Sequence, residues 1–312
     1  MRLCDRADSA TTIRSIWFVQ EYASSYALVN YRLRNPTMTG GEAGRYSFSN
    51  LDLIRSFQDP YGSERGFIGV HITMVAFSGA AVSAAEDVLA ATVEGNHGKF
   101  ENAMQRLLHT YKQINTVMET MWSRSRPSDY LSFRTFIFGT APKKGNPMFP
   151  NGVLYEGVSD QPIHLRGESG ANDSLVPLLD NLLEVTASLP KNALTDTLRD
   201  FRTYRPKTQR EYITLLEARA AQAGVKAFAT GSKATAKGKA LYLLMIDQVV
   251  SASRHRVYRS RMNTDDDSVC ACLARIPEPA LALCARVHHQ AGESQREVVR
   301  SRCIARLQDL IC

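Results

Sequence analysis

The chain has 312 residues, enough for one large domain or two small ones, and its hydrophobic content of 44% supports a substantial buried core. No stretch reaches the roughly 18 uninterrupted apolar residues that a membrane-spanning helix needs. The opening segment, MRLCDRADSA, carries charges where a secretion signal would need its apolar region. We therefore expect a globular, cytoplasmic protein that spans no membrane.

The net charge of +7 would permit binding to nucleic acid. The basic residues are scattered, however, over Lys143–Lys144, residues 202–207 and residues 226–239. Scattered charges are typical of a solvated surface, so we expect no nucleic-acid partner.

The six cysteines are unevenly placed, with Cys4 alone and the other five from Cys270 onward. The first 260 residues therefore do without disulfides or thiolate metal sites, which is typical of a reducing compartment. A zinc site from Cys270, Cys272, Cys284 and the pair His288–His289 is conceivable, but the spacing matches no standard set of zinc ligands.

Helical periodicity dominates the chain. Residues 66–95 and 100–122 carry apolar residues at intervals of three and four, and the second segment has one continuous stripe: Phe100, Met104, Leu107, Tyr111, Ile114 and Met118. A further helix is expected after Pro127, which suits a first turn, and before Gly139, which suits a C-terminal stop. The Pro- and Gly-rich residues 140–157 should be mostly irregular.

Later helices are expected at 174–188, 191–201, 208–223 and 237–260. No segment shows sustained strand alternation bounded by hairpin turns. The predicted fold class is therefore all-α.

Two pairs of residues inside these helices suggest a site. Phe67 and His71 are four residues apart and share a helical face, and Tyr130 and Arg134 repeat that spacing. Arg134 lies in the apolar segment YLSFRTFIFG, where its planar guanidinium suggests a carboxylate or phosphate partner. The alternatives are an arginine that snorkels or pairs with a structural acid, and a core His71 bonded to a backbone carbonyl.

A single histidine, His255, lies in the basic segment VVSASRHRVYRS. Helical geometry places it on the same face as Leu241, Leu244, Gln248, Ser251 and Ala252, and the neighbouring arginines point mostly elsewhere. The small residues one turn earlier would let a flat group approach, as an axial haem ligand requires. A satisfied core histidine is the alternative.

Several motifs then follow in an order that resembles one family across residues 17–260. That family is indoleamine 2,3-dioxygenase, a haem enzyme that opens the indole ring of tryptophan. The resemblance rests on these segments: LIRSFQD, RGFIGVHITMVA, SFRTFIFG, KKGNPMFPNGVLYEG, RGESGANDSLVPLLDNLLEV, LRDFRTYRPKTQREYITLLEA and SRHRVYR.

The resemblance implies a helical domain that binds haem b, with His255 as the proximal ligand of the iron. It implies that Phe67 packs on the substrate ring, that Arg134 binds the substrate carboxylate and that Tyr130 is an aromatic residue of the pocket. Ser169 would contact the substrate and the haem edge, although a flexible Gly-rich turn is the alternative.

Asp180 matches an acidic position near a haem propionate, with a solvated helix acid as the alternative reading. His71 departs from the vertebrate members of the family, which have serine at this distal position. The related tryptophan 2,3-dioxygenases use histidine there, so the resemblance implies a hydrogen bond from the indole N–H to neutral His71.

The implied reaction inserts both atoms of O2 across the indole C2–C3 bond of L-tryptophan, or of a related indoleamine, to give N-formylkynurenine. An electron donor would keep the haem ferrous, and the chain would act as a monomer. We expect residues 1–260 to form the catalytic domain, with the family's N-terminal small domain absent, and residues 261–312 to form a divergent, poorly ordered tail. The alternative is a truncated relative that binds haem or indole without catalysis.

Overall fold

A computed structural model describes residues 30–57, 61–134, 140, 149–164, 173–185, 196, 199–200, 202–203, 205 and 207–261. Of residues 42, 43, 131, 134 and 250–261 only the backbone is described. The predicted tail, from residue 262 onward, the possible zinc ligands and most of the expected helix at 191–201 lie outside these ranges.

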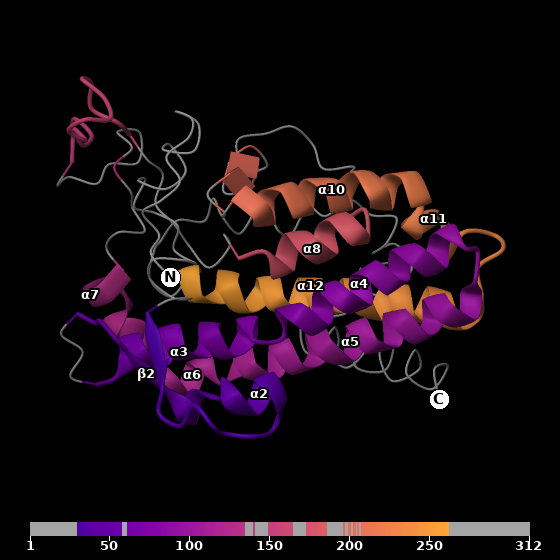
Figure 1. The fold of residues 1–312 in the computed structure, drawn as a ribbon, viewed down its shortest axis with the longest axis horizontal. Coiled ribbons are helices and arrows are strands. Elements are labelled where there is room, and N and C mark those ends of the chain that lie inside the picture. Colours follow the sequence, from indigo (N-terminus) through magenta and orange to yellow (C-terminus); the bar gives the residue numbers. More distant parts are fainter. Residues whose placement is uncertain are drawn as a thin grey trace, which may run out of the picture.

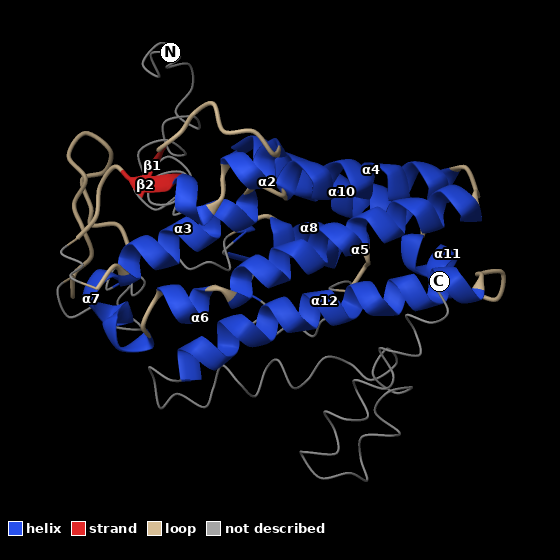
Figure 2. Cartoon of the chain, turned by 90° about the horizontal axis from the view of Figure 1, so that it is seen from below, coloured by secondary structure: helices blue, strands red, loops and turns tan. Residues whose placement is uncertain are grey.

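The described part of the chain is a helical bundle (Figures 1 and 2). Its helices, in chain order, are α2 (Gly41–Arg45), α3 (Ser63–Val75), α4 (Ser78–Val93), α5 (His97–Glu119), α6 (Met121–Arg124), α7 (Tyr130–Arg134), α8 (Leu175–Leu182), α10 (Lys207–Ala223), α11 (Val225–Thr230) and α12 (Ala236–Arg261). Two short 3-10 helices cover Phe48–Asn50 and Pro127–Asp129. The prediction of an all-α fold is confirmed.

The apolar stripe predicted for residues 100–122 lies at the centre of the core. All six of its members, from Phe100 to Met118, are buried on α5, which packs between α4 and α12. The side chain of Asn96 caps this helix by accepting a 3.0 Å hydrogen bond from the backbone N–H of Lys99. Gly95, with φ of 67°, supplies the left-handed turn that lets α5 fold back along α4.

Two predicted boundaries are wrong. The helix expected at 66–95 is two helices, α3 and α4, separated at Ala76 and Phe77 just before a Ser–Gly pair, a sequence at which helices often bend. The helix expected at 174–188 ends at Leu182, because Glu184 takes a left-handed φ of 52° and the N–H of Val185 donates to the carbonyl of Asp180. The short helices α2 and α11 were not predicted.

Two buried tyrosines hold α8 against the central helices. The hydroxyl of Tyr111 on α5 donates a 2.7 Å hydrogen bond to the carbonyl of Leu175, and the hydroxyl of Tyr242 on α12 donates one of 2.7 Å to the carbonyl of Leu183. These bonds satisfy the first and last turns of α8, where carbonyls and hydroxyls would otherwise be buried without partners. Burial raises the pKa of Tyr242 above its usual value.

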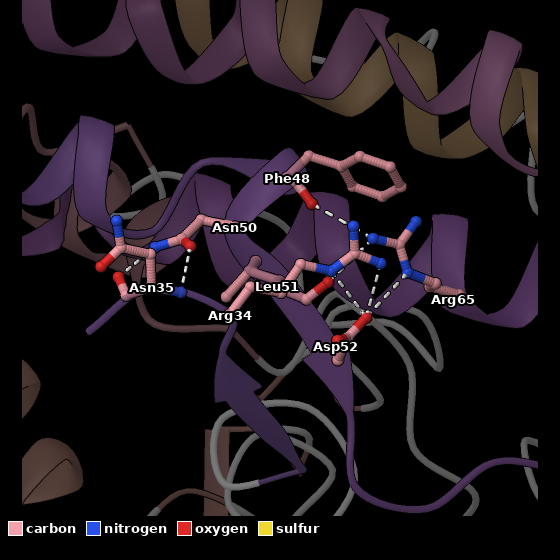
Figure 3. A network of polar contacts seen from close by, with 7 residues as sticks. All are labelled: Arg34, Asn35, Phe48, Asn50, Leu51, Asp52 and Arg65. Carbon is pink, nitrogen blue, oxygen red and sulfur yellow. Dashed lines mark hydrogen bonds and ion pairs between the residues drawn. The ribbon is translucent and has the colours of Figure 1, made fainter. Parts of the chain in front are cut away.

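A small hairpin packs against α3, and Figure 3 shows its polar contacts. Its strands, β1 (Tyr31–Leu33) and β2 (Leu51–Leu53), pair in antiparallel register, with Arg32 opposite Asp52. The guanidiniums of Arg65 on α3 and Arg124 on α6 lie 4.6 and 3.9 Å from the ring centre of Phe48, and both distances are those of cation–π contacts. The hairpin is therefore anchored to the helix that carries Phe67 and His71.

The segment Ser63–Val93, taken as one helix, is long and apolar enough to cross a membrane by length and composition alone. More than half of its most apolar window is buried inside the protein. The same composition is typical of the core helix of a soluble protein, so this segment is weak evidence for a membrane span.

Candidate functional site

Phe67 and His71 lie one helical turn apart on α3, as their spacing predicted, and both side chains are buried. The Nδ1 atom of His71 lies 2.8 Å from the carbonyl oxygen of Phe67. Because a carbonyl oxygen only accepts, Nδ1 must carry the proton in this bond. In the neutral ring, Nε2 is then an acceptor.

An aromatic cluster surrounds Phe67. Its ring centre lies 4.6 Å from that of His71, 5.6 Å from that of Tyr130 and 5.9 Å from that of Phe133. Tyr130 and Phe133 also meet edge to face, at 5.9 Å. These distances are those of favourable aromatic pairs, so the cluster joins α3 to α7.

A cavity of about 280 Å³ opens beside His71. Its mainly apolar walls come from α3, α4, α8 and α10 and include Val75, Val82, Leu178, Tyr212 and Ile213. An apolar cavity with few polar groups is the usual form of a small-molecule or cofactor site.

A polar network beside the cavity fixes Tyr212, one of its lining residues on α10, to α4. The Tyr212 hydroxyl donates a 3.0 Å hydrogen bond to Glu86 on α4, and Glu86 also binds Arg219 at 2.8 Å. Burial, followed by the hydrogen bond to Glu86, raises the pKa of Tyr212 well above its usual value. The Tyr212 hydroxyl therefore stays protonated, and the network fixes α10 against α4.

Three predicted site residues have side chains outside the described set. Arg134 is the last residue of α7, and only its backbone is described; the same holds for His255 on α12. Ser169 lies outside the described residues altogether. The roles predicted for these three side chains stay predictions.

Asp180 on α8 is not a solvated acid. Its side chain is 15% exposed, and its Oδ2 lies 3.6 Å from Nη2 of Arg202. Arg202 also donates a 3.1 Å hydrogen bond to Asn181, which in turn donates to the carbonyl of Ile213 on α10. Asp180 therefore belongs to a buried polar junction between α8 and α10.

The C-terminal end of α12, which carries His255, lies at the same end of the bundle as α3, α6 and α7 in both views (Figures 1 and 2). Leu241 and Leu244, on the face predicted to be buried, are at most 1% exposed. Gln248, next along that face, is fixed to α5 by a 2.9 Å hydrogen bond between Asn115 Nδ2 and Gln248 Oε1. The described part of the predicted stripe is confirmed as far as Gln248.

The comparison with protein families bears on this arrangement. The family model described as indoleamine 2,3-dioxygenase matches residues 16–252, which include α3, α7 and every wall of the cavity. The chain belongs to the indoleamine 2,3-dioxygenase family. Members of this family are haem-dependent dioxygenases, and the predicted family is confirmed.

Individual relatives agree. Over 198 residues the chain is 27% identical to indoleamine 2,3-dioxygenase 1 of Rattus norvegicus, a match that covers 62% of this chain and 46% of the relative. It is 28% identical to human indoleamine 2,3-dioxygenase 2 over 192 residues, or 61% and 44% of the two chains. The chain thus spans about half the length of the indoleamine 2,3-dioxygenases it matches.

A third relative is the myoglobin of the abalone Haliotis diversicolor, 30% identical over 126 residues, or 39% of this chain and 32% of the myoglobin. Myoglobins, like the dioxygenases of this family, are haem proteins. The comparisons therefore confirm haem as the cofactor of the family to which the chain belongs.

The lining of the cavity fits a haem group in its chemical character, although no described residue of α12 is among the lining residues. A flat, apolar macrocycle needs an apolar cavity, and the cavity beside His71 is mainly apolar. His255 on α12 is the candidate proximal ligand, because a neutral imidazole is the usual axial ligand of haem iron in oxygen-binding proteins. Among the described residues, no three His, Cys, Asp or Glu side chains lie close enough together to hold a metal ion. A haem site does not require such a group, because the porphyrin itself holds the iron.

Sequence reasoning did not place two residues of the site. Phe133 is 2% exposed and completes the aromatic cluster, and its position three residues after Tyr130 was the available signal. Tyr212 forms part of the cavity wall from a helix far away in sequence. No local pattern could have assigned it there.

Proposed function

We propose that the chain is a haem dioxygenase that inserts both atoms of O2 across the indole C2–C3 bond of L-tryptophan to give N-formylkynurenine. The observation that carries the proposal is the state of His71, which is buried at the wall of an apolar cavity with Nδ1 bonded to the Phe67 carbonyl. That bond makes Nε2 the hydrogen-bond acceptor of the neutral ring, and an indole N–H needs such an acceptor.

The haem, when bound, supplies the oxygen chemistry. His255 would hold it from α12, with Ser169 at its edge and Asp180 near a propionate. The protein's remaining contribution is orientation: a substrate fixed at two points presents the same ring atoms to the same place on every encounter. Indole would lie against Phe67 and Tyr130, its N–H would donate to His71, and its carboxylate would bind Arg134.

The rest of the proposal concerns which residues act, in what oligomeric state, and where in the cell. We place the activity in residues 1–260, acting as a cytoplasmic monomer with a cellular electron donor that keeps the iron ferrous, and we assign residues 261–312 no part in the reaction. A related indoleamine is the other substrate to test.

The similarity to a myoglobin favours a second candidate, reversible binding of haem and oxygen without turnover. The two candidates differ in what they require of the pocket. Oxygen carriage needs the haem ligand alone, whereas the dioxygenase reaction also needs groups that bind an amino acid. The presence of Phe67, His71, Tyr130 and Arg134 in one matched region supports the first candidate.

The test is to express residues 1–312, load the protein with haem, reduce it and add L-tryptophan with O2. The proposal predicts a Soret band and the formation of N-formylkynurenine. The variant His255→Ala should lose the haem, whereas His109→Ala, at an exposed histidine of α5, should retain it. Haem uptake without product would select the second candidate, and full haem retention by His255→Ala would refute the assigned ligand.

A further inference from the structure

The first turn of α3 is joined to the residue just before α7 by a partly buried hydrogen bond. The Oγ atom of Ser63, which is 1% exposed, donates to Oδ2 of Asp129 at 2.6 Å. The same hydroxyl accepts a 3.2 Å hydrogen bond from the backbone N–H of Arg126. Ser63 therefore bridges two points of the segment that leads into α7.

Close backbone packing lies beside this bridge. Gly66, one turn along α3, faces the carbonyl oxygen of Arg124, and a Cβ atom at Gly66 would lie 1.6 Å from that oxygen. The helix can approach the segment this closely only because residue 66 has no side chain. The bond between Ser63 and Asp129 thus forms beside a closely packed contact between α3 and the Arg124 backbone.

The two bonded residues lie at the starts of the two elements that carry the candidate site. Ser63, Phe67 and His71 are spaced by four residues and share one face of α3. Asp129 directly precedes Tyr130, the first residue of α7, and α7 ends at Arg134. Any shift at Ser63 and Asp129 would move one of these sets relative to the other.

We propose that Ser63 and Asp129 are positioning residues that set the separation between the indole-binding side of the pocket, on α3, and the carboxylate-binding side, on α7. The inference rests on the proposed function, because it assigns one end of tryptophan to each helix. A ligand held at two points is sensitive to the distance between them, whereas a ligand held at one point is not.

A ligand without a carboxylate separates positioning from a general loss of structure. Tryptamine has the indole and the amine of tryptophan but no carboxylate, so it would keep the indole contacts with Phe67, His71 and Tyr130 and lack only the bond to Arg134 at the end of α7. Ser63→Ala and Asp129→Ala should each raise the KM for L-tryptophan about tenfold, the usual effect of losing one charge-assisted hydrogen bond. Binding of tryptamine and the haem content should be unchanged.

The two substitutions should also be non-additive. If each residue acts through the other, the double variant Ser63→Ala/Asp129→Ala should have the same KM as either single variant. Asp129→Asn keeps an acceptor oxygen and should recover part of the loss. Ser132→Ala is the matched control, because its exposed hydroxyl donates to the backbone carbonyl of Asp129 within its own turn and does not take part in the bond between Ser63 and the Asp129 carboxylate.

Hydrogen exchange tests the inference without any measurement of turnover. In Ser63→Ala the backbone amides of α7 should exchange faster, while those of α5 and α10 keep their rates. Unchanged exchange in α7 would overturn the positioning role whether or not the wild-type protein makes N-formylkynurenine. Additive losses in the double variant, or an equal loss of tryptamine binding, would overturn it as well. A wild-type protein that forms no product but shows faster α7 exchange in Ser63→Ala would refute the proposed function and leave the mechanical link between the helices in place.

Discussion

His71 donates through Nδ1 to the carbonyl oxygen of Phe67, one turn earlier on α3, at 2.8 Å. The sequence left two readings of this histidine open, a core residue bonded to a backbone carbonyl and a ligand-binding residue. The structure confirms the bond to the carbonyl and places the ring at the cavity wall, and the ligand-binding role stays a prediction. A histidine held in this way needs no change of protonation in order to accept a hydrogen bond from indole.

The first prediction concerns His71→Ala. Loss of the acceptor should lower kcat/KM for L-tryptophan about tenfold, because a buried N–H of the substrate is left without its partner. The 1-methyl derivative of tryptophan has no indole N–H to donate, so its binding should be the same in both proteins. Inhibition or binding constants for the two ligands measure the difference. Thr73→Val is the control, since its hydroxyl bonds to the Gly69 carbonyl on the same helix but not at the cavity.

Much of the fold followed from helical periodicity because the long helices bury one continuous stripe. Every member of the stripe on α5 is buried, and α10 and α12 begin within one residue of their predicted starts. The break at Ala76 and Phe77 could not be predicted in the same way. Both residues keep right-handed helical backbone angles, so no left-handed stop residue marks the break, and the Ser–Gly pair that follows them is its only local signal.

The candidate site was likewise predictable only for contacts within a single helix. Spacing within a helix was enough to pair Phe67 with His71, because residues four apart share a face whatever the tertiary structure. The contact of Phe67 with Tyr130 and the cavity wall at Tyr212 depend on how α3 meets α7 and α10. Such contacts between distant segments are set by packing, and only the family resemblance indicated any of them in advance.

A second prediction concerns Arg134. Replacement by Ala should raise the KM for L-tryptophan about a hundredfold, because a buried carboxylate loses a charged partner. Tryptamine, which has no carboxylate, should bind both proteins equally. Steady-state kinetics and ligand titration measure the two effects. The control is Arg106→Ala, which removes an exposed arginine that pairs with Asp87 on the bundle surface. An equal loss of tryptamine binding in Arg134→Ala would contradict the assigned role.

A third prediction follows from the hairpin. The hydrogen bond from Arg34, reinforced by the charges of Arg34 and Arg65, holds the pKa of Asp52 below its usual value (Figure 3). A depressed pKa means that the ion pair contributes stability above the unfolded pKa of about 4 and loses it as the pH falls through the lower folded pKa. The stability difference between wild type and Asp52→Asn should therefore shrink between about pH 5 and about pH 3.

Thermal melts of the two proteins across this range measure the effect, which should be small because the pair is exposed. The stability difference between wild type and Arg34→Gln should shrink over the same pH range. Arg55→Gln removes the same charge from an exposed position just after β2, and its stability should change with pH as that of the wild type does. A constant difference between wild type and Asp52→Asn at all pH values would show that the charge of Asp52 does not stabilise the hairpin.

The last prediction concerns Gly66. A methyl group there would lie 1.6 Å from the Arg124 carbonyl oxygen, and backbone cannot yield as a flexible side chain would. Gly66→Ala should therefore lower the free energy of unfolding by about 3 kcal/mol, the upper part of the range for overpacked sites. Gly98→Ala is the matched control, because the new Cβ in the first turn of α5 meets only the Asn96 side chain, at 3.6 Å. That variant should be neutral or slightly stabilising, since alanine favours the helix. Denaturant unfolding compares the two, and equal stability of both variants would mean that α3 does not pack on the Arg124 backbone as closely as the structure has it.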